Sequence, residues 1–301
     1  MSDVTNGKYL ASYIEDAFRR NKPDNAQMKI KREAFMLSPM ITIEFAKKSH
    51  SFSFGNTPFN SENANSFIND KWALYESTHD AFPFPYTEAI EKESVQKHDD
   101  IQQNILRQIS DDQHPFTFPL ILKPNSGSLS RNVFLVHDDN ALLEAIKTIR
   151  TESDQGGKLL VQQYIGSPDT PDREIRALCL DGECMITYER VTSQNIPADK
   201  ITNPSLWPDV QRIGVLDPQI LEQINKIAQY LHEHHDVNYV GLDLKCTQDG
   251  KIWLIEGNSS PMGFQDIENE MENGKQLIHS LTNSMLERII TDNTSEAPTF
   301  I

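Results

Sequence analysis

Apolar and polar positions alternate most regularly in residues 237–261, where two apolar runs flank Asp249-Gly250. An Asp-Gly pair between two such runs predicts a β-hairpin. If this pair forms the turn, Asp243 lies directly opposite Glu256 on the neighbouring strand. Because side chains alternate across a strand, one face then consists of Val240, Leu242, Leu244, Trp253 and Ile255. The other face consists of Gly241, Asp243, Glu256 and Asn258.

A second hairpin is predicted for residues 173–191, which carry Asp181-Gly182 between two apolar runs. With that pair as the turn, the apolar face consists of Ile175, Ala177, Cys179, Cys184, Ile186 and Tyr188. Glu174 and Arg176 share the opposite face, and this register places Arg190 on the other side of the sheet from Arg176.

The first 62 residues predict a small α+β module, too short for a complete doubly wound domain. A helix over 5–21 presents an apolar stripe of Tyr9, Leu10, Tyr13, Ile14 and Phe18. Two short β-runs follow, MLSPMITIEF and HSFSFG, joined by Lys47-Lys48-Ser49. Residues 56–66 have the composition of a linker.

The rest of the chain mixes helices and strands. Helices are predicted over 67–79, 88–111 and 139–150, and strands over 118–124, 132–136 and 158–165. Residues 192–214 form a long polar loop of the kind that handles substrates. A helix striped by isoleucine starts at Asp217-Pro218. It ends in His232, His234 and His235, interpreted as surface residues that complement the helix dipole rather than a zinc site.

Composition narrows the class of protein. The chain has 301 residues, 38% hydrophobic and 24% charged, which suits one large globular domain or two modest ones. No apolar run approaches the roughly 20 residues of a membrane span, and the N-terminus lacks a signal-peptide core. The net charge of -16 argues against nucleic acid as a bulk partner. The three cysteines make no disulfide framework, so we expect a cytoplasmic protein with Cys179 and Cys184 reduced and buried.

The first hairpin also predicts a metal site. Directly opposed residues have Cβ atoms roughly 4.5–5.5 Å apart, and like charges there are destabilising. A cation between Asp243 and Glu256 removes the repulsion, and Asn258 adds a neutral oxygen on the same face. Such an oxygen-only set suits Mg²⁺, which completes its shell with water and phosphate oxygens. The alternative interpretation is a solvated hairpin face with two screened acids.

Two lysines are candidates for phosphate binding. Lys71 lies in the first turn of a predicted helix, where a cation gains nothing from the helix dipole, so its role can lie elsewhere. Lys123 ends a strand before residues 125–131, in which Ser126, Gly127 and Ser128 let backbone N–H groups approach a phosphate. The alternatives are an ordinary surface lysine and a merely flexible loop.

In this order, the pieces resemble the ATP-grasp superfamily over residues 67–285. Six motifs carry the resemblance: NDKW, LILKP, LLVQQYI, REIR, GLDLK and IEGNSSP. GLDLK and EGNSSPMGFQDIE are most similar to RimK-type α-L-glutamate ligases and their glutathione-synthetase and cyanophycin-synthetase relatives. D-Alanine ligases usually carry an arginine two residues before the aspartate, where this chain has Gly241.

The resemblance implies a role for each matching residue. Lys71 and Lys123 contact the nucleotide phosphates, with Ser126, Gly127 and Ser128 beside them. Glu174 holds the ribose, and the adenine lies against Gln162, Gln163, Tyr164 and Ile165. The metal ligands are Asp243, Glu256 and Asn258. Arg176 stabilises the transferring phosphoryl group, assisted by Arg190 and Asn203.

The implied fold is of the α+β class, an ATP-grasp fold in which two subdomains grip ATP. We expect an N-terminal module of residues 1–62, lobes over 63–165 and 166–295, and a flexible tail over 296–301. The short module leaves the first substrate's site open. No nucleic acid or membrane partner is expected. The sequence leaves open whether the chain forms a homo-oligomer.

The implied activity is that of an ATP-dependent carboxylate–amine ligase. It forms an amide between an amino acid, or a similar carboxylate, and an amine or amino acid through an acyl phosphate, releasing ADP and phosphate. The cofactors are ATP and Mg²⁺, with two ions expected and Mn²⁺ as a substitute, and the substrates are small amino acids or peptides. The alternatives are an ATP-grasp small-molecule kinase and a nucleotide-binding module without catalysis.

Overall fold

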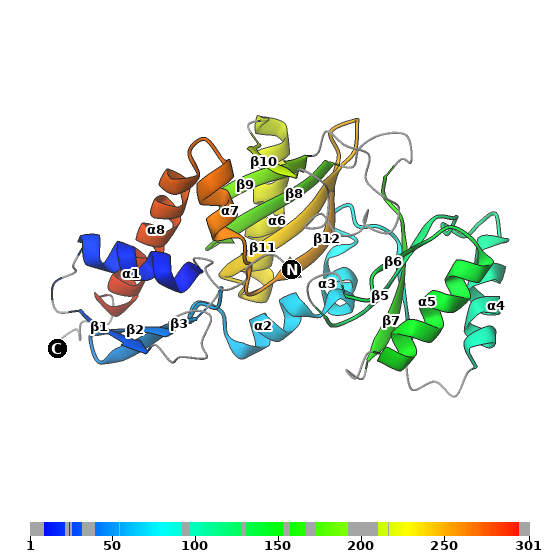
Figure 1. Cartoon of the computed structure of the whole chain (residues 1–301), viewed down its shortest axis with the longest axis horizontal. Helices are drawn as coiled ribbons and strands as arrows, with labels where there is room; N and C mark the ends of the chain where they lie inside the picture. Colours follow the sequence, from blue (N-terminus) through cyan, green and yellow to red (C-terminus); the bar gives the residue numbers. More distant parts are fainter. Residues whose placement is uncertain are drawn as a thin grey trace.

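The part of the chain that the structure describes folds into three antiparallel sheets with helices packed against them (Figure 1). The computed structural model describes residues 9–21, 24, 26–31, 40–53, 55–91, 97–127, 131–152, 157–166, 173–191, 210–215 and 217–294. Among these residues, none of the helices is both long and apolar enough to cross a membrane. The predicted tail beyond residue 295 lies outside the described residues.

The N-terminal sheet has the strand order β1-β2-β3, with β1 Gln27–Lys31, β2 Met40–Phe45 and β3 Lys48–Ser53. The sequence predicted β2 and β3 but not β1. The predicted helix begins later than expected, as α1 Leu10–Asn21. Its apolar stripe is part of one hydrophobic core. The same core contains residues of the small sheet, of α7 Phe264–Glu270, of α8 Gly274–Thr294 and of one face of the largest sheet. The first and last helices of the described residues, α1 and α8, thus pack against each other.

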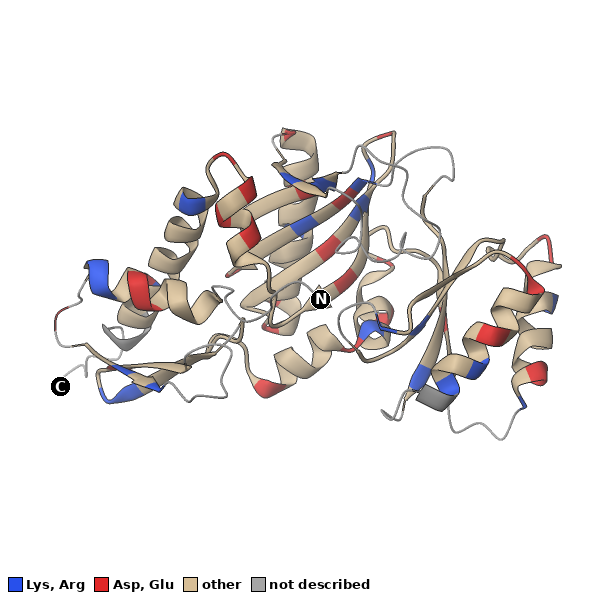
Figure 2. Ribbon diagram, in the orientation of Figure 1, with Lys and Arg blue, Asp and Glu red and all other residues tan. Residues whose placement is uncertain are grey.

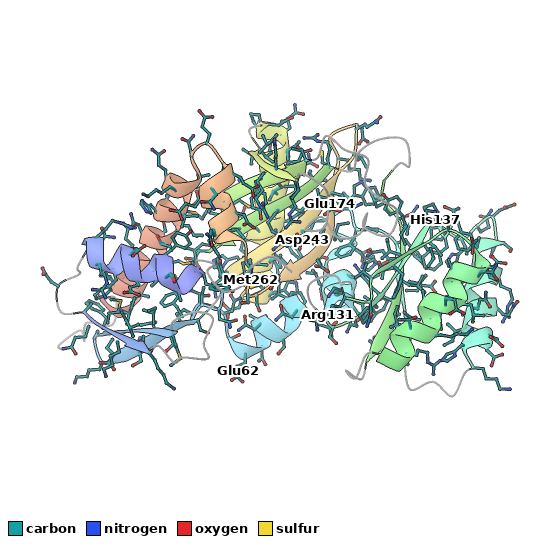
Figure 3. All side chains as sticks on the ribbon, in the orientation of Figure 1. Glu62, Arg131, His137, Glu174, Asp243 and Met262 are labelled. Atoms are coloured by element: carbon teal, nitrogen blue, oxygen red, sulfur yellow. The ribbon has the colours of Figure 1, made fainter. Side chains whose placement is uncertain are left out.

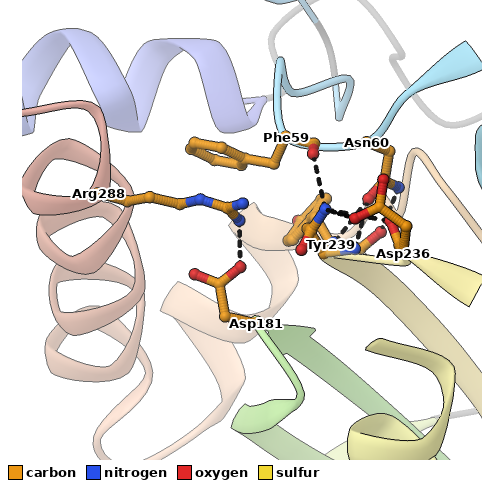
Figure 4. Close-up of polar contacts among 7 residues, drawn as sticks. Phe59, Asn60, Asp181, Asp236, Tyr239 and Arg288 are labelled. Carbon is orange, nitrogen blue, oxygen red and sulfur yellow. Dashed lines mark hydrogen bonds and ion pairs between the residues drawn. The ribbon is translucent and has the colours of Figure 1, made fainter. Parts of the chain in front are cut away.

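Residues 56–66 are anchored to the protein rather than forming a free linker. The Asn60 side chain accepts hydrogen bonds from the backbone N–H groups of Asn238 and Tyr239, at 2.8 Å each (Figure 4). Its amide group donates to the Tyr239 carbonyl at 2.7 Å. Arg288 of α8 lies over the Phe59 ring and contacts Asp181 (Figure 4). Asn60 therefore ties this stretch to the largest sheet.

The helix predicted over 67–79 is interrupted at Asp70. The end of α2 Glu62–Asn69 and all of α3 Lys71–Thr78 take its place. The Asp70 side chain accepts a hydrogen bond from the Ala73 N–H at 2.8 Å and so caps α3. This interruption puts Lys71 at the first position of a helix.

The second sheet has the strand order β4-β7-β5-β6 and is covered by two helices. Its strands are β4 Thr87–Glu91, β5 Leu120–Pro124, β6 Phe134–Val136 and β7 Lys158–Gln163. The helices α4 His98–Ile109 and α5 Asp139–Glu152 share one hydrophobic core with these strands. The prediction of a helix over 88–111 is wrong at its start, because Glu88 to Glu91 pair with β7 as a strand.

The largest sheet has the strand order β10-β9-β8-β11-β12. Its strands are β8 Arg173–Leu180, β9 Glu183–Val191, β10 Gln211–Gly214, β11 Tyr239–Cys246 and β12 Ile252–Asn258. The helix α6 Pro218–His235 packs on one face with the aliphatic residues of β8, β11 and β12. Strand β10 lies at the end of the predicted polar loop, whose residues 192–209 lie outside the described part of the chain.

A β-bulge in each predicted hairpin changes which residues share a face. In β8–β9, Leu178 pairs with Ile186 and Cys179 with Cys184, so Met185 is an extra residue. Ile186 and Tyr188 therefore lie on the face opposite Cys179, which corrects the predicted apolar face. In β11–β12, Asp243 pairs with Glu256 and Leu244 with Leu254, so Ile255 is extra. The buried partners of Leu242 and Leu244 are Ile252 and Leu254, not the predicted Trp253 and Ile255.

Candidate active site

Charged residues form rows across the face of the largest sheet that is opposite α6. The strand register places Tyr188, Arg176, Asp243 and Glu256 in one row. The neighbouring row contains Arg212, Arg190, Glu174 and Lys245. Figure 2 shows this interleaving of acidic and basic positions on the strands, and Figure 3 places Glu174 and Asp243 among them.

These rows form one wall of a cleft of about 740 Å³. The opposite wall comes from the second sheet and from α3, which contribute Lys71, Lys123, Gln162 and Tyr164. Residues about 190 positions apart in the sequence thus face one space.

Asp243 is held by a two-pronged ion pair. Arg176 Nε and Nη2 donate to its two carboxylate oxygens at 2.6 and 2.8 Å, and Arg190 Nη1 lies 3.9 Å from Asp243 Oδ1. Burial raises the pKa of Asp243, and the Glu256 charge adds to the rise while Arg176 opposes it. Both members of the pair are nearly buried, at 12% and 13% side-chain exposure, so the interaction is weakly screened by solvent.

Glu256 faces the lysines of the opposite wall. Lys71 Nζ lies 3.6 Å from Glu256 Oε2 and donates to the Gly127 carbonyl at 3.2 Å. Burial acts against ionisation of Glu256, but the charges of Lys71, Lys123 and Arg176 outweigh it and hold its pKa below the usual value. The unfavourable helix position of Lys71 is therefore offset by contacts inside the cleft, as the sequence suggested.

Lys123 is fixed by a chain of side-chain hydrogen bonds. Its Nζ donates to Gln162 Oε1 at 3.0 Å, and Gln162 Nε2 donates to Thr87 Oγ1 at 2.8 Å. The Thr87 hydroxyl proton goes to the Pro85 carbonyl, so Thr87 can only accept from Gln162. The Gln162 oxygen must therefore point at Lys123. Burial lowers the pKa of Lys123 to about 8, an effect that Glu256 opposes and Lys71 reinforces.

Arg190 and Arg212 lie directly opposite each other on β9 and β10. Both lie over the Tyr188 ring, with Cζ 5.9 and 6.0 Å from its centroid. Arg212 donates to Asp266 and Glu270 of α7 at 2.7 Å each. The Nε atoms of both arginines are buried and have no hydrogen-bond partner among the described residues. This end of the cleft therefore offers unused donors to an anion.

Arg190 is on the same face as Arg176, which corrects the register predicted from the turn alone. The predicted two-residue turn is present, since Leu180 pairs with Glu183. The bulge at Met185 then moves Arg190 from the face of α6 to the cleft.

Sequence reasoning missed Lys245. Its Nζ lies 3.6 Å from Glu174 Oε1 and 4.7 Å from the centroid of the Tyr164 ring. It thus connects the residues expected at the ribose with those expected at the adenine. The alternation of GLDLK could have indicated it, because Lys245 lies two residues after Asp243 on one strand face.

Residues 259–263 pack tightly beside the acidic pair. Ser259 exchanges hydrogen bonds with Asn69, at 2.8 and 3.0 Å, and Asn258 Oδ1 accepts from the Ser260 N–H at 2.8 Å. A Cβ atom on Gly241 would lie 2.6 Å from Pro261 Cβ, and one on Gly257 would lie 2.4 Å from an Ile68 methyl group. Position 241 therefore has no room for a larger side chain.

The structure places most of the predicted site residues on the walls of this one cleft. They are Lys71, Lys123, Ser126, Gly127, Gln162, Gln163, Tyr164, Ile165, Glu174, Arg176, Arg190, Asp243, Glu256 and Asn258. Ser128 and Asn203 lie outside the described residues.

The arrangement fits a magnesium nucleotide. Two carboxylates and the Asn258 amide oxygen form an oxygen-only set, and Asn258 Oδ1 keeps one lone pair after its bond to Ser260. The buried, unpaired Nε of Arg190 and the ammonium groups of Lys71 and Lys123 suit anionic oxygens. A metal–phosphate complex offers a cation to the acids and anionic oxygens to the lysines, in addition to the ion pairs that they already form.

A family model of the RimK-like ATP-grasp domain matches residues 89–284. This chain belongs to the RimK-like ATP-grasp domain family. The match contains every strand of the two sheets that border the cleft apart from the first two residues of β4. It confirms the fold expected from the sequence motifs.

Two curated relatives are distant in sequence and longer than this chain. A D-alanine–D-alanine ligase of Pediococcus pentosaceus is 24% identical over 163 residues, 49% of this chain and 41% of the relative. The N-acetylaspartylglutamate synthase A of Homo sapiens is 24% identical over 197 residues, 65% of this chain and 44% of the relative. The chain thus spans less than half the length of these curated relatives.

The fold is also that of a solved ligase. The D-alanine–D-alanine ligase of Bacillus anthracis superposes with a TM-score of 0.55 and 16% identity, covering 78% of this chain and 70% of that one. This likeness establishes the ATP-grasp architecture only. In this chain, Pro261 fills the space beside Gly241, the position at which D-alanine ligases usually carry an arginine.

Proposed function

We propose that this chain is an ATP-dependent ligase that joins the carboxylate of an amino acid, or a similar acid, to an amine or a second amino acid. The observation that carries the proposal is the opposition of Asp243 and Glu256 in a cleft that also contains Lys71 and Lys123. One ligand with a divalent cation and a polyphosphate neutralises both sets of charges.

In this proposal, Lys71 and Lys123 bind phosphate oxygens, with the backbone near Ser126 and Gly127 beside them. Gln163, Tyr164 and Ile165 border the adenine, and Glu174 binds the ribose. Gln162 is assigned a different role from the expected adenine contact, because both ends of its amide are used to orient Lys123. Asp243, Glu256 and Asn258 hold Mg²⁺. We also propose that a second ion binds and that Mn²⁺ can replace Mg²⁺.

The proposed chemistry solves the problem that a carboxylate is a poor acyl donor. Phosphorylation by ATP gives an acyl phosphate with a good leaving group, which the amine attacks with release of phosphate. Bound Mg²⁺ supplies neutralisation of the phosphate charge. Arg176 and Arg190 donate to the oxygens on which charge develops. If Asp243 held the metal, it would give up at least one of its two bonds to Arg176, which would free Arg176 for this role.

The names of the two curated relatives agree with amino-acid substrates, since one is a D-alanine–D-alanine ligase and the other makes N-acetylaspartylglutamate. The division into residues 1–62, 63–165 and 166–295 stays a prediction, as do a cytoplasmic location and a homo-oligomer. Small amino acids or peptides are the proposed partners.

The test is release of ADP from ATP and Mg²⁺ in the presence of pairs of amino acids. A ligase requires both members of a productive pair, and mass spectrometry detects their condensation product. Release of ADP without an amine, with accumulation of a phosphorylated acid, would instead identify a kinase. Glu256→Gln is the matched inactive control. Nucleotide binding without turnover for any pair of amino acids or peptides would contradict the proposal.

A further inference from the structure

Cys179 and Cys184 form a pair of thiols on the back of the largest sheet. They are directly opposed on β8 and β9, beside the bulge at Met185, and their Sγ atoms lie 2.8 Å apart. Both are free cysteines that pack with α6, on the face opposite the cleft. The pair therefore belongs neither to the nucleotide site nor to its substrate end.

The two thiols differ in exposure. Cys179 is 1% exposed, and burial raises the pKa of its thiol, so it is a poor nucleophile by itself. Cys184 is only partly buried and is the more exposed of the two, so we assign it as the member that a dissolved oxidant meets first. This difference assigns an attacking and a resolving cysteine within the pair.

Cys246 is too far away to join this pair. Cys179 pairs with Val240 on β11, and Cys246 lies six residues further along the same strand. At the rise of a β-strand that is a separation of roughly 20 Å. Cys246 is instead buried beside Arg173, whose Nη1 lies 3.3 Å from its sulfur.

We propose that Cys179 and Cys184 are a site of reversible oxidation by hydroperoxides. The Cys184 thiolate attacks one oxygen of hydrogen peroxide, which breaks the O–O bond, gives a sulfenic acid and releases hydroxide that becomes water. The Cys179 sulfur then attacks the Cys184 sulfur, so the S–S bond forms as the S–O bond breaks. The leaving hydroxide takes the Cys179 proton. In total, two thiols and one peroxide become one disulfide and two waters.

The location between paired strands makes this disulfide easy to reduce. Directly opposed residues of antiparallel strands keep their Cβ atoms roughly 4.5–5.5 Å apart, whereas a relaxed disulfide prefers about 3.8 Å. Closing the bond pulls the strands together, and strained disulfides are the labile ones. A small thiol therefore restores the reduced pair. The inference does not depend on the proposed ligase activity.

The test uses the folded, full-length chain, hydrogen peroxide and peptide mass spectrometry. Trypsin cleaves after Arg176 and Arg190, so both cysteines fall in one peptide, residues 177–190. Peroxide followed by a thiol-alkylating reagent should leave this peptide unalkylated and lighter by two hydrogen atoms. Treatment with dithiothreitol before alkylation should restore two alkylated cysteines.

Matched variants separate the pair from the third cysteine. Cys246→Ala should form the disulfide as the natural chain does, whereas Cys179→Ala should carry only oxygen adducts on Cys184. Three results would overturn the proposal: two alkylatable thiols after peroxide, Cys184 oxidised to an acid while Cys179 stays alkylatable, or a disulfide between two chains. The first measurement uses the natural chain, so it does not depend on the folding of a variant.

Discussion

The two hairpins of the largest sheet share an Asp-Gly turn but have different geometries. Asp181 and Gly182 both have positive φ, 52° and 79°, and form the two-residue turn that the sequence predicted. In the other hairpin, only Gly250 of the Asp-Gly pair has a positive φ, at 78°. Thr247 pairs with Lys251 there, so the loop has three residues. The same dipeptide thus gives turns that differ by one residue.

The bulges then act in opposite ways. Ile255 compensates for the longer turn, so Asp243 still faces Glu256 as predicted. In the hairpin of β8 and β9, no longer turn compensates for the extra residue Met185. The bulge therefore places Arg190 on the same face as Arg176. One hairpin thereby presents two acids, the other presents two arginines, and pairing of β8 with β11 sets Arg176 directly opposite Asp243. The same face also carries Glu174 on β8 and Lys245 on β11, so acidic and basic side chains alternate on it, and we expect it to hold both a metal and an anion.

The largest expected effect comes from the acidic hairpin. Glu256→Gln or Asp243→Asn should lower turnover of ATP by roughly 10²–10³-fold, because each removes a charge that positions the metal and the transferring group. ADP release at saturating substrates measures this. Asp249→Asn, which removes an acid from the turn of the same hairpin, is the matched control and should keep full turnover. Equal losses in the three variants would mean that the hairpin matters only for folding.

A smaller effect on stability should distinguish the two arginines. Without metal or nucleotide, Arg176→Met should lower the free energy of unfolding by roughly 1–3 kcal/mol, because it removes both donors from the nearly buried Asp243. Arg190→Met should cost less than about 1 kcal/mol, since Arg190 reaches Asp243 only at 3.9 Å. Urea unfolding measures both. A larger loss of stability for Arg190→Met than for Arg176→Met would show that Arg190 contributes more to the stability of the β8–β9 hairpin than Arg176 does.

The smallest effect concerns pH. Burial lowers the pKa of Lys123 to about 8, so the nucleotide-free protein loses this charge as pH rises through that value. If only the charged form binds phosphate, affinity for ATP should fall about tenfold between pH 7 and pH 9, with proton uptake on binding. Calorimetry in buffers of different ionisation enthalpy measures that uptake. Lys123→Met should abolish it, and uptake that persists in this variant would assign it to another group.

The contribution of Lys123 to stability changes with pH in the opposite direction to its contribution to ATP affinity. The Lys123 pKa in the folded chain lies below that of an unfolded lysine, about 10.4, so the unfolded state binds more protons between these values. The contribution of Lys123 to the free energy of unfolding therefore increases as pH rises from about 8 to about 10.4 and is constant below that window.

Much of the site could be read from the sequence, because short motifs keep their chemistry wherever they fold. The motifs NDKW, LILKP, LLVQQYI, REIR, GLDLK and IEGNSSP identified the family. The predicted opposition of Asp243 and Glu256 is present, but only because the bulge at Ile255 offsets the longer turn. The unfavourable helix position of Lys71 indicated a role elsewhere, and the structure places its ammonium group 3.6 Å from Glu256, while binding of a phosphate stays a prediction. These signals depend on local periodicity and residue type, which the sequence contains in full.

Other features were decided by contacts between distant segments. The bulges at Met185 and Ile255 shift the register within each hairpin, and Met185 packs against the core that contains α1 and α8, so no local pattern placed Arg190 in the cleft or Leu254 in the core. The role of Gln162 appeared only when β4, β5 and β7 brought Thr87 and Lys123 to its two ends. The sequence by itself determined which chemical groups the protein has and the family it belongs to. Tertiary structure determined which face each group occupies, because a one-residue bulge reverses a strand's faces and its energy depends on residues far away in the chain.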